Sequence, residues 1–209
     1  RDVAPSRGLG DVYKRQLVDG VNVRDMDLYN LRDNIGMAMQ DVFLFSDTIE
    51  GNIAYGRPNC SFEEVKQAAI MADANHFIQA LSDGYDTIVG ERGVGLSGGQ
   101  KQRISLARAL LKDPSILILD DTTSAVDMET ESYIQSQLKK LDNKCTIFVI
   151  AYRISSIRDA DLILVMDNGR IIEQGTHEQL VAAGGYYATA FHNQYGEIPQ
   201  EILSGKGEK

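Results

Sequence analysis

The sequence has few of the residues that would place it among disulfide-rich, metal-binding or membrane-spanning proteins. It has two cysteines, Cys60 and Cys145, whose positions match neither a metal-binding spacing nor a disulfide framework. This usage fits a compartment that keeps thiols reduced. The three histidines are scattered, and the apolar runs have the length of strands, far below the roughly 18–20 residues that cross a bilayer. We therefore expect a mixed α/β domain without covalent cross-links.

Positive charge is also scarce. Lys and Arg number 21 against 30 Asp and Glu, which gives a net charge of −9. Because binding to a phosphate backbone depends on clustered Lys and Arg, we expect no nucleic acid partner. Hydrophobic residues make up 43% of the 209-residue chain, which is enough for the core of one domain.

The two ends of the chain differ in pattern from the rest. Residues 1–16 show neither strand nor helix periodicity and lack the apolar core of a signal peptide. We expect them to be a foreign or disordered leader. Residues 197–209 are polar and predict a flexible tail. The domain itself is then expected over residues 17–196.

Strand-sized apolar runs recur along this domain. Leu17–Gly20 predicts a short strand with a turn, and Ile35–Met39 predicts a second strand. Ile116–Leu119 and Thr146–Ile150 are continuous apolar runs, as in a parallel sheet that is covered on both faces. The helical pattern of residues 129–141 between them completes a strand–helix–strand unit.

Helix starts and turns are marked by their characteristic residues. Capping-box patterns open predicted helices over residues 61–81 and 176–184, and Ser97 opens another that ends near residue 112. An Asp-Asn-Gly sequence at 167–169 predicts a hairpin turn. The predicted fold is layered α/β, with a mainly parallel sheet and a helical insert between about residues 55 and 115.

The most specific motif is Leu96-Ser97-Gly98-Gly99-Gln100, at the start of the predicted helix 97–112. Backbone N–H groups and the helix dipole make such a helix N-terminus attractive to anions, and glycine lets a phosphate approach the backbone closely. A bare Ser-Gly-Gly sequence is also found in ordinary loops. The full string from Leu96 to Ala109, however, resembles the signature motif of ABC-type ATPases.

Other segments resemble ABC motifs in the order that the family has them. Ile116–Asp120 is similar to the Walker B strand, whose carboxylate holds Mg²⁺, although a strand-end aspartate can also serve only in a turn. Gln40 resembles the Q-loop glutamine, a contact of Mg²⁺ and of the attacking water. Ser124–Asp127 resembles the D-loop, which links the two nucleotide sites of a dimer.

Two segments resemble the exporters of this family. Residues 41–56 are similar to the exporter version of the Q-loop, which implies that the apolar residues 43–45 face a membrane domain. Core packing is the alternative for each of them. Residues 87–93 resemble the exporter segment before the signature, where Glu91 and Arg92 would take part in communication with the membrane domain. Taken alone, these two residues would be a solvated surface.

Three features depart from the family's pattern. The sequence contains no G-x-x-x-x-G-K-S/T motif, whose backbone and lysine bind the nucleotide phosphates, so we expect an N-terminally truncated domain. Asp121 stands where the family has a catalytic glutamate, and its side chain is one methylene shorter. Tyr152 stands where the family has its switch histidine, and a phenol can donate a hydrogen bond but cannot become cationic.

The resemblance covers residues 17–195 and implies a P-loop NTPase-like nucleotide-binding domain of an ABC exporter. It implies that Gln40, Asp121 and Tyr152 are catalytic. It implies that Asp120 and Gln40 hold Mg²⁺. The residues implied to contact ATP are Ser97, Gly98, Gly99, Gln100 and Asp127. It further implies a transmembrane domain in the same full-length chain and a second nucleotide-binding domain. The implied location is the cytoplasmic face of a bacterial plasma membrane.

The departures concern only one of the two sites to which such a chain contributes. Asp121 and Tyr152 weaken the chain's own site, whereas the signature is intact, which is the pattern of heterodimeric exporters. We expect an ATP-hydrolysing subunit that powers efflux and supplies its signature to a partner's ATP site. The alternatives are a regulatory half that completes the partner's site without hydrolysing ATP and a fragment without activity. The exporter-like segments and the negative charge disfavour an ABC ATPase that acts on DNA or ribosomes.

Overall fold

The computed structural model describes the chain in three stretches, residues 16–90, 95–141 and 144–196. The predicted leader, the predicted flexible tail and the pair Glu91 and Arg92 lie outside the described residues, apart from Gln16. Among the helices of the described stretches, none has both the length and the apolar character that a bilayer span requires.

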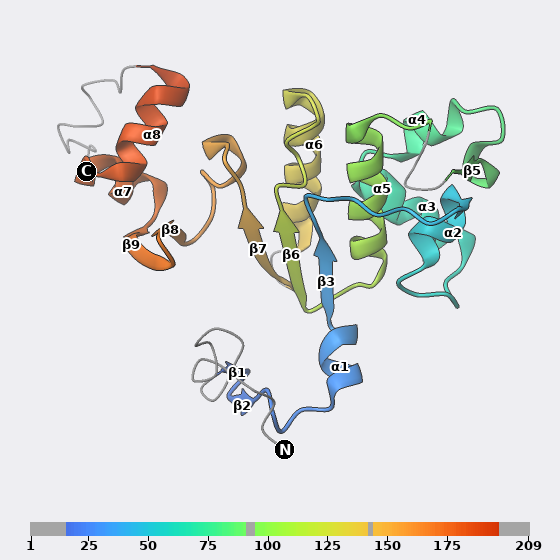
Figure 1. Ribbon diagram of the computed structural model, residues 1–209, viewed down its shortest axis with the longest axis horizontal. Coiled ribbons are helices and arrows are strands. Elements are labelled where there is room, and N and C mark those ends of the chain that lie inside the picture. Colours follow the sequence, from blue (N-terminus) through green and yellow to red (C-terminus); the bar gives the residue numbers. More distant parts are fainter. Residues whose placement is uncertain (1–15, 91–94, 142–143, 197–209) are drawn as a thin grey trace.

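The centre of the structure is a three-stranded parallel sheet (Figure 1). Its order is β3 (Ile35–Ala38), β6 (Ile116–Asp120) and β7 (Thr146–Ile150). The helix α6 (Met128–Leu138) connects β6 to β7. The predicted strands, their parallel arrangement and the strand–helix–strand unit are therefore confirmed.

The two faces of this sheet differ in burial. Leu117 and Leu119 of β6 are at most 3% exposed and belong to a core that includes Ile104 and Ile134 from the covering helices. On the opposite face, Met37 pairs in register with Ile118, which pairs with Phe148. Met37 and Phe148 are 50% and 55% exposed. The prediction that the apolar run of β7 is covered on both faces is wrong, because Phe148, Val149 and Ile150 are all exposed. Among the described strands, β7 also pairs only with β6 and lies at the edge of the sheet.

Helices gather on one side of the sheet, at the right of Figure 1. They are α2 (Ile49–Ala54), α3 (Phe62–Met71), α4 (Asn75–Gln79) and α5 (Gly98–Leu111). The short strands β4 (Asp47–Thr48) and β5 (Ile88–Val89) pair antiparallel beside them, and a 3₁₀ turn at Gly84–Asp86 precedes β5.

The predicted helix over residues 61–81 is present but interrupted. The capping box of Ser61 and Glu64 is formed as predicted. The helix ends at Met71 because Asp73 adopts a left-handed backbone conformation, with φ of 54°. The carbonyl and carboxylate oxygens of Asp73 both accept hydrogen bonds from Arg103 of α5, at 2.8 and 3.0 Å. A contact with a distant helix therefore fixes the break.

The C-terminal part of the described chain forms a second, smaller core. The hairpin of β8 (Ile163–Asp167) and β9 (Arg170–Gly175) turns through Asn168 and Gly169, both at positive φ, as predicted. The helix α7 (His177–Ala183) has the predicted capping box. A further helix, α8 (Tyr186–Tyr195), was not predicted, and its Tyr187 packs in this core.

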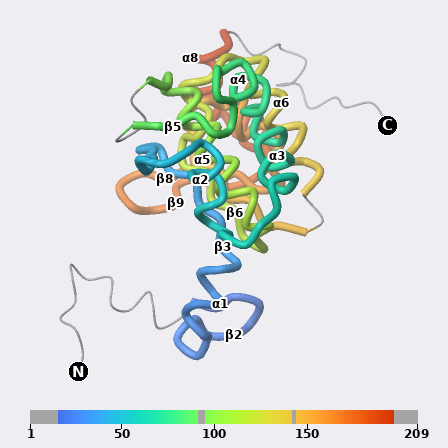
Figure 2. Tube along the Cα trace, turned by 90° about the vertical axis from the view of Figure 1, so that its right-hand side faces the viewer, coloured from blue at the N-terminus to red at the C-terminus, as the bar shows by residue number. Residues whose placement is uncertain are grey.

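The N-terminal elements lie apart from the central sheet. The strands β1 (Leu17–Val18) and β2 (Val21–Asn22) form a small hairpin, and α1 (Leu28–Asp33) leads from it into β3. Figure 2 shows them at the end of the molecule opposite α4 and α8. The predicted short strand and turn at residues 17–20 are confirmed.

Candidate functional site

Two predicted site segments meet where β3 and β6 end. Because neighbouring parallel strands end at the same edge of a sheet, Gln40, which follows β3, lies near Asp120 and Asp121 at the end of β6. The Gln40 side-chain amide donates to Oδ2 of Asp121 at 3.4 Å. Asp121 is 9% exposed and takes a left-handed conformation with φ of 48°. The fold thus brings the predicted base together with the predicted Mg²⁺ ligands.

The chemistry of this edge fits Mg²⁺. Gln40, Asp120 and Asp121 offer only carboxylate and amide oxygens, which are the ligands that a hard cation prefers. Within the described stretches, no group of three or more His, Cys, Asp or Glu side chains could hold a metal. A site with one or two carboxylates suits Mg²⁺, because this ion keeps several waters and is completed by substrate phosphates.

The signature segment begins the 14-residue helix α5. Ser97 is the N-cap, and its hydroxyl oxygen accepts a hydrogen bond from the backbone N–H of Gln100 at 3.3 Å. The Ser97 amide in turn donates to Gln100 Oε1 at 2.9 Å. The side-chain oxygen of Gln100, a predicted ATP contact, is therefore engaged in a capping box. Ser97 and Gly98 are exposed.

The signature packs directly on the segment that resembles the D-loop. A Cβ atom at Gly99 would lie 2.7 Å from the carbonyl oxygen of Ala125. Gln102, which is 6% exposed, accepts from the Ala125 amide at 3.1 Å. Its amide nitrogen donates to Ser124 Oγ at 3.2 Å and to the Asp121 carbonyl at 3.4 Å. These contacts join α5 to the loop between β6 and α6.

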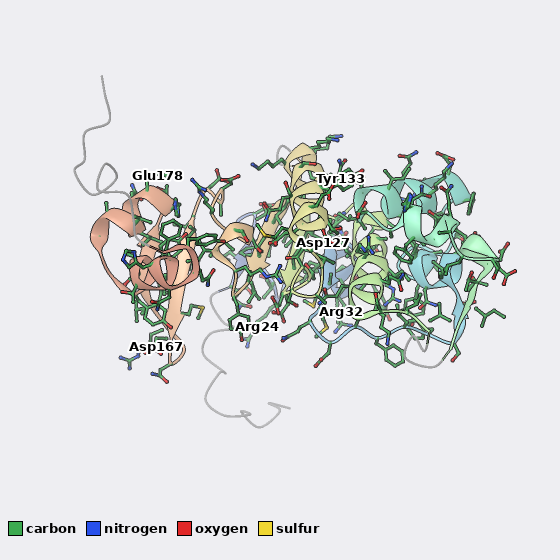
Figure 3. All side chains as sticks on the ribbon, turned by 90° about the horizontal axis from the view of Figure 1, so that it is seen from above. Arg24, Arg32, Asp127, Tyr133, Asp167 and Glu178 are labelled. Carbon is green, nitrogen blue, oxygen red and sulfur yellow. The ribbon has the colours of Figure 1, made fainter. Side chains whose placement is uncertain are left out.

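Asp127 has a structural role as the N-cap of α6 (Figure 3). Its carboxylate accepts from the Thr130 amide at 2.9 Å and from the Thr130 hydroxyl at 3.2 Å. The hydrogen bond from the Thr130 amide is the main reason that the pKa of Asp127 lies below its ordinary value. The predicted D-loop aspartate is therefore charged and held at the beginning of a helix.

Tyr152 stands apart from the other predicted catalytic residues. It follows β7 by two positions, and the residue is 80% exposed. The hydrogen bonds of the described residues connect Gln40 with Asp121 but do not connect the Tyr152 phenol with either. Its carbonyl oxygen accepts from the Gln194 side chain at 2.7 Å. The backbone at this position is held, while the phenol is open to solvent.

The segment 41–56 combines core and surface residues. Leu44 is 1% exposed, so the prediction that it faces a partner is wrong because it packs in the core. Phe43 is exposed, and Phe45 is half-buried and stacks on Tyr55. Arg108 of α5 lies over both stacked rings.

Arg108 fixes the backbone of this segment. It donates to the carbonyl oxygens of Asn52 at 2.7 Å and Phe43 at 3.0 Å, and burial lowers its pKa. The helix α5 thus reaches from the exposed signature serine to the loop that carries the exposed Phe43.

Sequence reasoning missed four polar residues around the site. They are Gln102, Arg108, Glu131 and Arg153. The first and third carried a detectable signal, because Gln102 and Glu131 fall on the buried faces of α5 and α6, where an apolar side chain is expected. The two arginines gave no such signal, because their partners, which are backbone carbonyl oxygens and the side chains of Asn52 and Glu131, are distant in sequence.

Comparison with known proteins identifies the class. The family model of the ABC transporter matches residues 9–124, more than half of the chain, so the chain belongs to this family. A solved bacterial Atm1-family ABC exporter with ATP bound superposes with a TM-score of 0.82 at 45% sequence identity, covering 88% of this chain and 32% of that one. The fold is that of the nucleotide-binding domain of an ABC exporter, with a P-loop NTPase-like core.

Curated relatives agree with this assignment. An uncharacterized ABC transporter ATP-binding protein, YknU of Bacillus subtilis (strain 168), is 55% identical over 181 residues, which are 87% of this chain and 31% of that protein. An ATP-dependent lipid A-core flippase of Legionella pneumophila (strain Lens) is 48% identical over 187 residues, 89% of this chain and 32% of the flippase. The chain therefore spans about a third of the length of these relatives.

Proposed function

We propose that this chain is the ATP-binding part of a bacterial ABC exporter and that it supplies its signature segment to an ATP site on a partner domain. The observation that carries the proposal is the exposed Ser97 and Gly98 at the start of a long helix. The Ser97 oxygen accepts from the Gln100 amide, so its hydroxyl proton stays available for a phosphate oxygen. The first-turn N–H groups and the helix dipole add further attraction for the phosphate.

The chain's own site is proposed to hydrolyse ATP slowly. Bound ATP and Mg²⁺ would supply the γ-phosphate and the charge neutralisation for its transfer to water. Asp120 and Gln40 would hold the ion, and Asp121 would orient the water. The Asp121 carboxylate is about 1 Å short of a glutamate's reach, and a misplacement of that size can cost about 100-fold in rate. The exposed phenol of Tyr152 supports the same proposal, because it cannot supply a cationic switch.

A membrane domain is the proposed second partner. The exposed Phe43 and Tyr55 flank the half-buried Phe45 on the loop that Arg108 fixes to α5. This aromatic surface suits contact with a helix end of a membrane domain at the cytoplasmic face of the membrane. Because α5 also carries Ser97, movement at this surface would be transmitted to the partner's ATP site.

A heterodimer with the flippase relative tests the proposal. One subunit is the flippase, and the other is a chimera in which this chain replaces the matching 187-residue segment of the flippase. Separate affinity tags allow the mixed dimer to be purified. Ser97→Ala in the chimera should remove most ATPase activity, whereas Asp121→Asn in the chimera should change it little. The opposite ranking would contradict the proposal.

A single-turnover measurement separates slow hydrolysis from none. Ser97→Ala in the chimera inactivates the partner's site, so the ATP cleavage that remains comes from the site that uses this chain's Asp121. Adding Asp121→Asn to this heterodimer should lower the slow phase of ATP cleavage. If no slow phase exists, this chain is a regulatory half that completes the partner's site without hydrolysing ATP.

A further inference from the structure

Glu131 is a buried carboxylate that the proposed ATP chemistry does not use. Its side chain is 4% exposed, and it accepts from Arg153 Nη1 at 3.2 Å. Thr123 Oγ1 donates at 3.5 Å and Ser155 Oγ at 3.4 Å, and Ser156 Oγ donates as well. A charge buried this deeply persists only where partners replace its water. All of these side-chain partners lie in two loops, one after β6 and one after β7.

Arg153 uses the same guanidinium to hold backbone oxygens of the D-loop-like segment 124–127. Its Nη2 donates to the Ser124 carbonyl at 2.9 Å, and its Nη1 donates to the Val126 carbonyl at 3.4 Å. The backbone hydrogen bonds of the loop itself are at the long end of the range, 3.4 Å from the Ser124 amide to Asp121 and 3.3 Å from the Val126 amide to Thr123. The path of this loop therefore depends on side chains from outside it.

The segment that carries Arg153 is anchored from the other side by α8. Gln194 accepts from the Ile154 amide at 3.0 Å and donates to the Tyr152 carbonyl at 2.7 Å. The Ser155 amide donates to the Tyr195 hydroxyl at 3.1 Å. The backbone of residues 152–155 is thus held between α8 and the loop 124–127, so a shift at Tyr152 displaces Arg153.

We propose that Glu131 and Arg153 are positioning residues that join the segment at Tyr152 to the loop 124–127. Glu131 fixes the guanidinium, and the guanidinium fixes the loop. Gln102 and the close approach of Gly99 then connect the loop to the signature helix. The chain's own nucleotide site and the signature that it presents to the partner are coupled through this path. This inference rests on the proposed function.

Amide hydrogen exchange on the full 209-residue chain tests the structural link. Glu131→Gln keeps the size of the side chain but removes the charge that holds Arg153, and Arg153→Lys keeps the charge but loses the forked contact with two carbonyls. Both should speed exchange in residues 124–126 by about tenfold or more, since each removes charge-assisted hydrogen bonds. Glu129→Gln, the same change at an exposed position of α6, should leave exchange there unchanged. Equal exchange in all three variants would overturn the proposal.

Kinetics of the flippase heterodimer test the coupling. With Asp121→Asn in the chimera, the remaining rate reports the partner's site. Glu131→Gln and Arg153→Lys should each lower the kcat of the partner's site by about tenfold or more. KM for ATP should stay the same, because the substitutions disturb the closed site that cleaves ATP and not the binding of the nucleotide. If Glu131→Gln folds poorly, Arg153→Lys still tests the coupling, because the side chain of Arg153 is half-exposed and its position tolerates substitution.

The outcomes separate the two levels of inference. If Ser97→Ala has no effect on the heterodimer, the proposed function fails. If Ser97→Ala abolishes activity while both positioning variants match Glu129→Gln in kcat, the proposed function stands and the coupling is refuted. A rise in KM with unchanged kcat would also refute the coupling, because it would place the effect on nucleotide binding.

Discussion

Alanine substitutions at the two neighbouring signature glycines test how closely α5 packs on the loop 124–127. At Gly99, an added Cβ would lie 2.7 Å from the Ala125 carbonyl oxygen and 3.3 Å from a methyl carbon of Val126. At Gly98, the nearest atom would be the Ala125 Cβ, at an ordinary contact distance of 3.7 Å. Both substitutions gain about 0.4–1 kcal/mol of stability, because alanine gives the unfolded chain less conformational entropy than glycine does. The gain cancels in the comparison, so the difference between them measures the clash.

The expected difference follows from the cost of overpacking. Forcing a methyl group against a backbone carbonyl costs about 1–3 kcal/mol. Gly98→Ala should therefore be more stable than the unsubstituted chain, and Gly99→Ala less stable than Gly98→Ala by about 1–3 kcal/mol. Urea denaturation followed by far-UV circular dichroism measures this, provided that the slopes agree. If Gly99→Ala is as stable as Gly98→Ala, the close packing of signature and loop is wrong.

Two further predictions concern stability. Burial lowers the pKa of His177, so the folded state favours the neutral ring. This preference contributes fully to the free energy of unfolding above about pH 6.5, the ordinary pKa of histidine. The contribution is lost as the pH falls toward the lower pKa of the folded state. The urea midpoint of the unsubstituted chain should therefore drop more between pH 7.5 and 5.5 than that of His177→Gln, and equal drops would contradict this. Leu117→Ala, at a fully buried position of β6, should cost about 2–5 kcal/mol, whereas Phe148→Ala on the exposed face should cost about 1 kcal/mol or less in the same urea assay.

The sequence was most informative where a local rule decides the structure. Capping boxes at Ser61 and Thr176, the Asn168-Gly169 turn and the strand-length apolar runs all formed as predicted. Each depends on residues within about four positions of one another, so the pattern is visible in the sequence.

The failures occurred where a distant contact decides the structure. The helix after Ser61 breaks at Asp73 because Arg103, 30 residues away, binds its oxygens. The apolar run of β7 indicated burial, but burial also requires a neighbouring element on each side.

The candidate site was predictable to the extent that motifs mark it. The signature serine, the strand-end aspartates and Gln40 were all located, and the parallel sheet brings the last three together. The side chains that hold these motifs in place were not found. Glu131 and Arg153 pair with each other across 22 positions, and Arg153 also binds backbone carbonyl oxygens, which every residue type presents, so no local sequence pattern marks these partners.

Among the strands that the structure describes, β7 has one edge without a partner, and this has a consequence for the behaviour of the isolated polypeptide. A strand with one unpaired row of N–H and C=O groups is a template for a strand from another molecule. The neighbouring apolar row of Met37, Ile118 and Phe148 would add hydrophobic contact to such pairing. We therefore expect concentrated solutions of the chain to self-associate edge to edge, and to do so less when Phe148 is replaced by lysine. An apparent molar mass, measured by light scattering, that does not change with concentration would contradict this. Pairing of this edge of β7 with another segment would prevent such self-association.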